Sequence, residues 1–556
     1  MIKRILFIML FSAATLFAQR MEVEDVRKAL AQAVQESLVV SPDNGRVIAI
    51  TDREGHVLAV WSVDVNGPAL PNPTPSIVAD AVSKAGAAAF LSSNQHAFTT
   101  RTAAFIVQNH FPPGVENRPN GPLIGVNFSS MAFSDTNKYK APSPANTFST
   151  PPVPGVDDLG SAKPADAFRS VPFTSLLTVP AAGSSPGGVA LFKDGLLIGG
   201  IGVVGFSDPS VKDFEIAFQA NVNERIALSG QAGFRPRAQF DGSNVFIDGI
   251  RVAYQVGAGS NATVADPIAY LAANGQAVTF PDIDGQDGSA DDAPVDYSPK
   301  ASPPSPDPDY PDPFELTGPN GTKGQLRSAI RADPMGGTIS GEARLTAAEV
   351  ENILRLAAER SVITRAGIRL PRGQIARVWI SVVNNPASDG EEPVVLGTYR
   401  TPDATIFSWD VAIQKARTAV FFSRGLERGT PRAFSSRSVG FLAQDMYPPG
   451  IENKPAGPFN GFQALLSLSG SEVPASPINS NVPNGITIFP GGFPLYRNGV
   501  LIGAIGVSGD GIEQDDIVGA SGARDFLAPL ESRADNMVYE KARLPYAKFP
   551  RASTSF

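Results

Sequence analysis

The stretch AFTTRTAAFIVQNHFPPGVENRPNGP, residues 97–122, returns later in the chain as AFSSRSVGFLAQDMYPPGIENKPAGP, residues 433–458. The two stretches align without a gap, and they share the segment Pro-Pro-Gly-x-Glu-Asn-x-Pro. Chance does not plausibly supply a match of this length. A long internal repeat is the sequence signature of a repeated structural unit. The chain is therefore expected to contain two copies of one domain.

Two flanking blocks recur in the same order as this central motif. Upstream, residues 82–90 match residues 413–421. Downstream, residues 187–199 match residues 491–503. Three collinear blocks indicate a duplicated domain.

The hydrophobic pattern around these blocks predicts the elements of each copy. An amphipathic helix is expected over residues 23–38, and its counterpart starts at the capping box Thr346-Ala347-Ala348-Glu349. Short β-branched strands follow at 47–51 and 56–61. Further helices are expected around Lys84, Phe105 and their counterparts, and the Asp-Gly and Asn-Gly pairs predict hairpins at residues 194–195 and 498–499.

This plan of helices and hairpins predicts an α+β fold with two domains in tandem, each an antiparallel sheet flanked by helices. The expected boundaries are a signal peptide at 1–19, a first domain with a long insertion at 21–235, a β-rich elaboration at 236–280, an acidic proline-rich linker at 281–340, a second domain at 341–530 and a C-terminal tail at 531–556.

The N-terminal segment predicts where the protein is located, and the composition of the chain excludes several function classes. Lys3 and Arg4 precede an apolar run from Ile5 to Phe17, which predicts a cleaved export signal and a periplasmic or extracellular protein. The rest of the chain has no run long enough for a membrane span, so none is expected. It contains no cysteine, so it has neither disulfides nor thiolate metal sites. A net charge of −8 without a basic face argues against nucleic-acid binding.

The second copy resembles the GlcG/HbpS-like family, which includes the C-terminal domain of PduO proteins. Residues 407–419 and 491–509 are similar to its two signature regions. The resemblance implies a profilin-like domain, a tendency to oligomerise, and binding of haem or a related tetrapyrrole. The first copy departs from the pattern: Gly86 stands where the second copy has Arg417, and residues 203–206 replace the Val-Ser-Gly segment.

Haem needs cationic partners for its propionates and an axial ligand for its iron. Lys84 and Lys415 occupy equivalent positions, as do Arg101 and Arg437, and Arg417 adds a fifth candidate cation. The structural alternative is that the lysines and Arg101 and Arg437 cap carbonyl groups or pair with the glutamates of the repeated turn, Glu116 and Glu452.

The candidate iron ligands are the three histidines of the chain, His56, His96 and His110, together with Met446. His56 follows Gly55, where family members often carry a Gly-His pair. His110 aligns with Met446, and His96 aligns with Arg432. The alternative is that each histidine is an ordinary surface or half-buried side chain.

Three other groups of residues have patterns that argue against a catalytic serine, a phosphate loop and a calcium site. Ser508 has no histidine in its own copy to activate it, and Gly199 to Gly202 lie in a strand pattern instead of a phosphate loop. The aspartates between residues 282 and 292 lack the spacing of an EF-hand, so calcium is not expected.

The expected function is therefore that of an exported binding protein for haem or a related tetrapyrrole, with the two copies packed as an intramolecular pseudo-dimer. Two alternatives remain open at this point. One is a non-catalytic interaction or scaffold protein that has lost haem binding, and the other is an enzyme of small-metabolite utilisation, which the family's association with glycolate and diol utilisation suggests.

Overall fold

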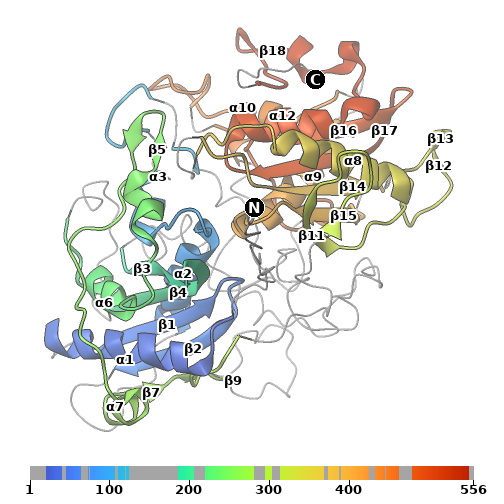
Figure 1. Ribbon diagram of the computed structural model, residues 1–556. Coiled ribbons are helices and arrows are strands. Elements are labelled where there is room, and N and C mark those ends of the chain that lie inside the picture. The colour runs from blue at the N-terminus through green and yellow to red at the C-terminus, as the bar shows by residue number, and fades with distance from the viewer. Residues whose placement is uncertain are drawn as a thin grey trace, which may run out of the picture.

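The structure is a computed structural model of the full chain, and it forms two halves that lie side by side (Figure 1). It describes residues 20–40, 45–63, 73, 75–106, 110–118, 121–123, 186–205, 219–280, 295–302, 314–368, 373–386, 388, 390–424, 432–444, 446–461 and 479–549. We call residues 20–302 the first half and residues 314–549 the second half. The predicted signal peptide and the aspartates between 282 and 292 lie outside the described residues.

The first half contains a five-stranded antiparallel sheet in the order β3-β4-β1-β2-β7. The strands are β1 Arg46–Asp52, β2 Val57–Val63, β3 Gly188–Lys193, β4 Leu196–Gly205 and β7 Gln276–Ala277. The turn between β3 and β4 has positive φ angles at Asp194 (54°) and Gly195 (82°). The predicted Asp-Gly hairpin is thereby confirmed.

The second half contains a six-stranded antiparallel sheet in the order β10-β11-β15-β14-β17-β16. Its strands are β10 Phe314–Glu315, β11 Lys323–Ser328, β14 Val378–Asn384, β15 Val395–Arg400, β16 Gly492–Arg497 and β17 Val500–Gly509. The series β16-β17-β14-β15 repeats the order β3-β4-β1-β2 of the first half. The register repeats too, since Arg46 faces Gly205 and Val378 faces Gly509.

Parts of the expected linker at residues 281–340 form strands, including β10 and β11. Residues 323–328, assigned to the linker, form β11 and pair with β15. Their sequence KGQLRS has no apolar run that would have predicted a strand. The edge of β15 supplies the hydrogen-bonding partners, so tertiary pairing overrides the weak local propensity.

Each sheet is covered by helices on both faces. In the first half, α1 Val23–Val40 and α6 Val222–Gly230 pack on the face that carries Ile48 and Ile50. Helix α2 Pro75–Leu91 packs on the opposite face, against Val47 and Ala49. Because successive strand residues point to opposite faces, β1, which is buried along its whole length, belongs at the centre of such a three-layer arrangement.

The second half repeats these layers. Helices α8 Ala347–Ser361 and α12 Ile512–Gly522 pack on the face with Ile380, and α9 Phe407–Ser423 packs on the face with Trp379. Helix α8 begins with the predicted capping box, in which Thr346 and Glu349 each accept from the backbone N–H of the other. The short helices α3 Thr100–Ile106 and α10 Ser436–Leu442 carry the start of the central repeat.

Glycines in the long strands allow α2 and α9 to approach the sheets closely. A Cβ on Gly202 would overlap the carbonyl oxygen of Ala81 in α2, and one on Gly506 would overlap that of Ala412 in α9. The strand glycines therefore serve close backbone packing, as the sequence pattern predicts.

In each half the helix that follows the long hairpin, α6 or α12, is followed by a small hairpin that packs back on the repeat. These are β5 Phe246–Ile247 with β6 Ile250–Arg251, and β18 Val538–Tyr539 with β19 Ala542–Arg543. Thr99 and Ser435, at equivalent positions, donate their hydroxyls to the carbonyl oxygens of Tyr254 and Tyr546, both at 2.5 Å. Residues 531–546, assigned to the C-terminal tail, are thus the second half's equivalent of the β-rich elaboration.

The remaining described helices and strands are short: α7 Pro267–Ala273, β8 Thr279–Phe280, β9 Val295–Asp296, β12 Thr338–Ile339 and β13 Glu342–Ala343. Among the described residues, no helix combines the length and apolar character that crossing a bilayer requires.

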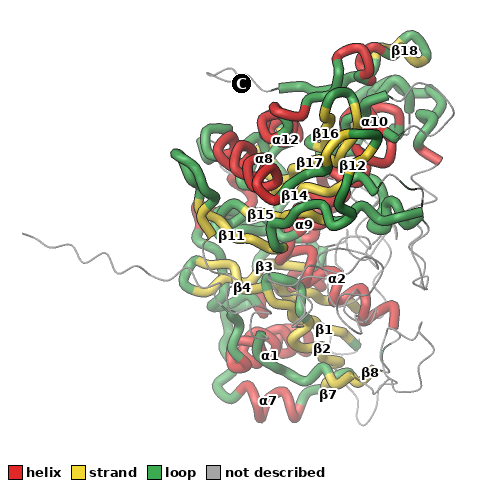
Figure 2. The backbone as a smooth tube through the Cα atoms, turned by 90° about the vertical axis from the view of Figure 1, so that its right-hand side faces the viewer, coloured by secondary structure: helices red, strands yellow, loops and turns green. Residues whose placement is uncertain are grey.

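The two halves share a hydrophobic core. One cluster of buried side chains joins Phe90 and Leu91 of α2 to Trp409 and Ile413 of α9. Figure 2 shows the sheets of the two halves stacked one above the other, with α2 and α9 between them. The junction between the halves is therefore a packed interface, to which α2 and α9 contribute together with residues such as Phe105 and Val245.

Candidate functional site

The predicted arginines of the repeat pair with a helix of their own half, and Arg101 is fully buried whereas Arg437 is half-buried. Arg101 in α3 makes a two-pronged contact with Glu224 in α6, at 2.7 Å (Nε to Oε1) and 2.6 Å (Nη2 to Oε2), and both side chains are 0% exposed. Arg437 in α10 donates from Nε to Asp516 in α12 at 2.5 Å. The partners are thus Glu224 and Asp516, and not the glutamates of the repeated turn.

The predicted lysines bind backbone carbonyls, as the structural alternative proposed. Lys84 donates from Nζ to the carbonyl oxygens of Pro186 and Val203, at 3.1 and 3.3 Å. Lys415 donates to the carbonyl oxygen of Val507 at 2.7 Å and to Asp515 at 2.8 Å. All four cations make their contacts within their own half: the lysines join a helix to a strand, and the arginines join two helices.

Burial changes the pKa of the Asp516 carboxyl group. Its pKa is raised from 3.8 to about 6, because burial outweighs the attraction of Arg437. The folded state therefore binds the proton more tightly than the unfolded chain does. The stabilisation that results is present below about pH 4 and lost as pH rises through about 6.

We expect the free energy of unfolding of the natural chain, compared with that of Asp516→Asn, to rise between about pH 7 and about pH 4, by up to about 3 kcal/mol. Urea unfolding of both proteins at the two pH values measures the difference. Parallel pH profiles for the two proteins would contradict the assignment.

Arg417 joins α9 to two loops of the second half. It is 1% exposed, pairs through Nη2 with Glu392, and donates from Nη1 to Asn484 at 3.2 Å and from Nε to the carbonyl oxygen of Pro393 at 3.3 Å. Gly86 occupies this position in the first half, so the network belongs to the second half.

Two of the three histidines are engaged inside the chain. His96 is fully buried, and its Nδ1 and Nε2 lie 2.9 Å from Ser93 Oγ and 2.7 Å from the carbonyl oxygen of Leu91. His110 is half-buried in the repeated turn, with Nε2 3.2 Å from Glu452 Oε1. In this arrangement both nitrogens of His96 are already used. Met446, the counterpart of His110, lies half-buried in the second repeated turn.

His56 differs from the other two. It follows the turn between β1 and β2, and its Nδ1 lies 2.9 Å from Asp52 Oδ2. A carboxylate only accepts hydrogen bonds, so in the neutral form of the ring the proton is on Nδ1 and the Nε2 lone pair is not used in this contact. Nε2 is buried and has no hydrogen-bond partner among the described residues.

Asp52 organises the whole turn around His56. Its Oδ1 accepts the backbone N–H of Glu54 at 2.9 Å and that of His56 at 3.0 Å. One carboxylate thereby fixes the backbone of the turn and the orientation of the imidazole. A carboxylate on the outer nitrogen is also the usual support of a metal-binding histidine.

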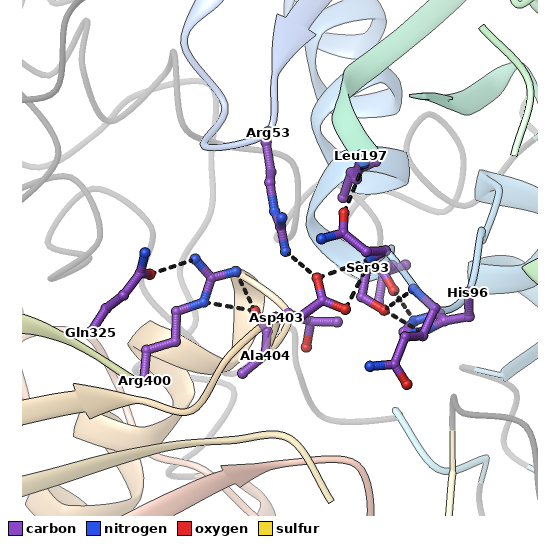
Figure 3. A network of polar contacts seen from close by, with 12 residues as sticks. Arg53, Ser93, His96, Leu197, Gln325, Arg400, Asp403 and Ala404 are labelled. Carbon is purple, nitrogen blue, oxygen red and sulfur yellow. Dashed lines mark hydrogen bonds and ion pairs between the residues drawn. The ribbon is translucent and has the colours of Figure 1, made fainter. Parts of the chain in front are cut away.

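The same turn contacts the second half through two ion pairs. Arg53 donates from Nη2 to Asp403 at 2.7 Å (Figure 3). Glu54 accepts from Arg327 Nη1 in β11 at 2.9 Å. The ends of the pairs are 273 and 350 residues apart in the chain, so local sequence patterns could not have revealed them.

Behind these ion pairs the second half presents two stacked tryptophans. The rings of Trp379 and Trp409 lie 4.9 Å apart and nearly parallel, at 8°. The guanidinium of Arg327 lies 4.2 Å from the ring centre of Trp409, in the geometry of a cation–π contact. Burial lowers the pKa of Arg327 to about 10, which leaves it charged at neutral pH.

The corresponding connection of the second half, between β14 and β15, is longer and has no histidine. The equivalent of Asp52 is Asn384, whose Oδ1 accepts the backbone N–H of Val394 at 2.7 Å. Val394 stands at the position of His56, as the strand registers show. An imidazole supported in this way therefore occurs once among the described residues, in the first half.

Comparison with known proteins gives a family match for a segment of the second half. Residues 376–524 match the model of the family described as haem degrading protein HbpS-like. This segment is an HbpS-like domain. It runs from just before β14 to just past α12, and it contains Lys415, Arg417 and Arg437. The resemblance found in the sequence of the second copy is thereby confirmed.

One curated protein is similar to part of the chain. The chain is 28% identical over 153 residues to the corrinoid adenosyltransferase PduO of Salmonella typhimurium. The aligned residues make up 28% of this chain and 33% of that protein. The match thus spans about a third of the curated relative's length.

Two solved structures resemble parts of the chain. One is a PduOC–haem complex, with 22% identity, a TM-score of 0.22, and coverage of 33% of this chain and 94% of that chain. The other is the Klebsiella pneumoniae protein ORFY, with 19% identity, a TM-score of 0.22, and coverage of 34% and 94%.

Proposed function

We propose that this protein binds haem or a related tetrapyrrole, and that His56 is the axial ligand of the iron. The observation that carries the proposal is the geometry of His56, whose Nδ1 is held by Asp52 and whose Nε2 is buried without a hydrogen-bond partner among the described residues. A neutral imidazole with one oriented nitrogen and one available lone pair is the form that ligates haem iron. The HbpS-like match at residues 376–524 supports the same ligand class.

The direct test is a titration of the full chain with hemin, followed through the Soret band. A saturable shift supports the proposal, whereas an unshifted, non-saturating spectrum would instead favour an interaction or scaffold role. The family description also mentions haem degradation, and decay of the Soret band after binding would separate degradation from simple binding.

Asp52→Asn provides a sharper prediction. The second half already uses Asn384 at the equivalent position, where its side chain supports the turn by accepting the N–H of Val394. The variant should therefore keep the turn but lose the carboxylate that orients His56. We expect hemin affinity to fall by about 10- to 100-fold, the usual effect of removing such a supporting group. Unchanged affinity would show that Asp52 does not support an iron ligand.

We further propose that the two halves are tandem profilin-like domains packed as an intramolecular pseudo-dimer. The repeated strand order and register support this, as does a reciprocal contact between the two repeated turns. The backbone N–H of Asn117 donates to Glu452 Oε1 at 3.2 Å, and that of Glu452 donates to Asn117 Oδ1 at 3.4 Å. Analytical ultracentrifugation tests whether one chain is the complete particle or whether chains assemble further.

We also propose that the protein is exported to the periplasm or beyond. The support is the sequence of residues 1–19, in which two basic residues precede an apolar run. Fractionation of expressing cells tests this, with the protein expected outside the cytoplasm.

A further inference from the structure

We propose that the second half of the chain positions His56, with Asp403 and Arg327 acting as positioning residues for a ligand that belongs to the first half. The inference rests on the proposed function, because it assigns these residues a role toward the same iron ligand. Neither residue is placed to touch the ligand itself. Each acts through the turn that His56 follows.

Asp403 links two segments of the first half. Its carboxylate accepts from Arg53 at 2.7 Å and from the backbone N–H of Asn94 at 2.9 and 3.0 Å (Figure 3). Arg53 is next to Asp52 in the turn, and Asn94 lies in the loop that leads to His96. The carboxylate is only 11% exposed, so little water competes for these bonds.

Arg327 holds the next residue of the turn. Its side chain is 1% exposed, and it pairs with Glu54 at 2.9 Å while lying over Trp409. A buried guanidinium strongly requires a charged partner. Glu54 is therefore confined to one position, and its own backbone N–H is bound to Asp52 Oδ1.

These contacts form one continuous path from the second half to the imidazole. Asp403 and Arg327 hold Arg53 and Glu54, the turn holds Asp52, and Asp52 orients the ring of His56. Burial is the largest cause of the lowered pKa of Arg400. Arg53 and Arg327 lower this pKa further, whereas Glu54 and Asp403 raise it. The charges at this junction therefore also interact with one another.

The histidine and the family signature lie in different halves of the sequence, which agrees with the proposal that one half positions a residue of the other. The second half keeps the family signature but has Val394 where the first half has His56. The first half has the histidine but departs from the family signature at Gly86 and at residues 203–206. In our proposal the HbpS-like half contributes to the site by shaping its partner's turn.

The test compares Asp403→Ala, Asp403→Asn and a matched control, Asp25→Ala, in the full chain. Asp25 is 13% exposed, and it also accepts from one cation, Lys193, and from one backbone N–H, that of Glu22. Among the described residues, its hydrogen-bond partners lie within the first half. It therefore reproduces the loss of an ion pair without touching the junction.

Two measurements report on His56 beyond stability. In the ligand-free protein, long-range 1H–15N correlation spectra give the fraction of the Nδ1–H tautomer of His56. In the hemin complex, the electron paramagnetic resonance spectrum and the affinity report the strength of axial ligation.

For Asp403→Ala we expect a lower Nδ1–H fraction, a mixed spin state and an affinity reduced by about 10-fold. Asp403→Asn should restore most of the natural behaviour. Its amide oxygen can accept both bonds, and asparagine tolerates the φ of 67° found at this position. Asp25→Ala should leave both spectra unchanged.

Natural spectra in Asp403→Ala, together with a loss of thermal stability like that of Asp25→Ala, would overturn the positioning role. If the natural chain fails to bind hemin but Asp403→Ala still changes the tautomer fraction, then positioning stands and the haem proposal fails. If Asp403→Ala does not fold, Glu54→Gln takes its place, since it weakens the contact with Arg327 at nearly constant volume. A natural tautomer fraction in that variant would equally overturn the proposal.

Discussion

Replacing His56 with alanine is expected to abolish saturable hemin binding, with an affinity loss of more than about 100-fold. Loss of a supporting residue already costs about 10- to 100-fold at a metal site, and removal of the ligand itself should exceed that. Imidazole added to the solution should partly restore the spectrum, because it can enter the space that the ring leaves. Soret titrations with and without imidazole measure both effects.

His110→Ala is the control for this prediction, because it removes a half-buried histidine whose contacts are with Arg118 and Glu452 in the repeated turns. We expect it to bind hemin as the natural chain does. If His56→Ala binds normally and His110→Ala does not, the assignment of the ligand is wrong, although the haem proposal survives.

Breaking the pair between Arg101 and Glu224 is expected to have the largest effect on stability. Both side chains are 0% exposed, so either single change leaves a charge buried without its partner. Arg101→Met and Glu224→Gln should each lower the free energy of unfolding by about 3 to 5 kcal/mol. Urea unfolding followed by circular dichroism measures these losses.

The double variant Arg101→Met, Glu224→Leu separates pairing from packing. It removes both charges together, and we expect it to be more stable than either single variant. The backbone N–H of Val256 loses an acceptor at 3.1 Å in that variant, so some loss remains. A double variant as unstable as the sum of the singles would show that the two side chains do not interact energetically.

The fold could largely be predicted from the sequence because its signals are local or repeated. The turn at Asp194-Gly195 is encoded by two residues that accept positive φ, and the capping box at Thr346 by two residues one turn apart. The collinear repeat then transfers each prediction from one half to the other. Strand β11 was missed because the edge of β15, and not its own sequence, makes it a strand.

The candidate site could be predicted only in part. The sequence indicated His56 as one of four iron-ligand candidates, but the hydrogen bonds that distinguish His56 from His96 depend on the folded chain. The repeated cations were conspicuous in the sequence, yet their buried partners Glu224 and Asp516 lie far along the chain. The contacts of Asp403 and Arg327 join different halves, and no local pattern encodes such a pairing.

The most direct test of the account is the number of hemin molecules that one chain binds. A single supported histidine, with Val394 at the equivalent position of the second half, predicts one tightly bound hemin per chain. The measurement is a Soret titration at protein concentrations well above the dissociation constant, with the end point compared with the chain concentration. An end point at one equivalent, lost in His56→Ala, is the predicted result, and two equivalents or no saturation would contradict the account.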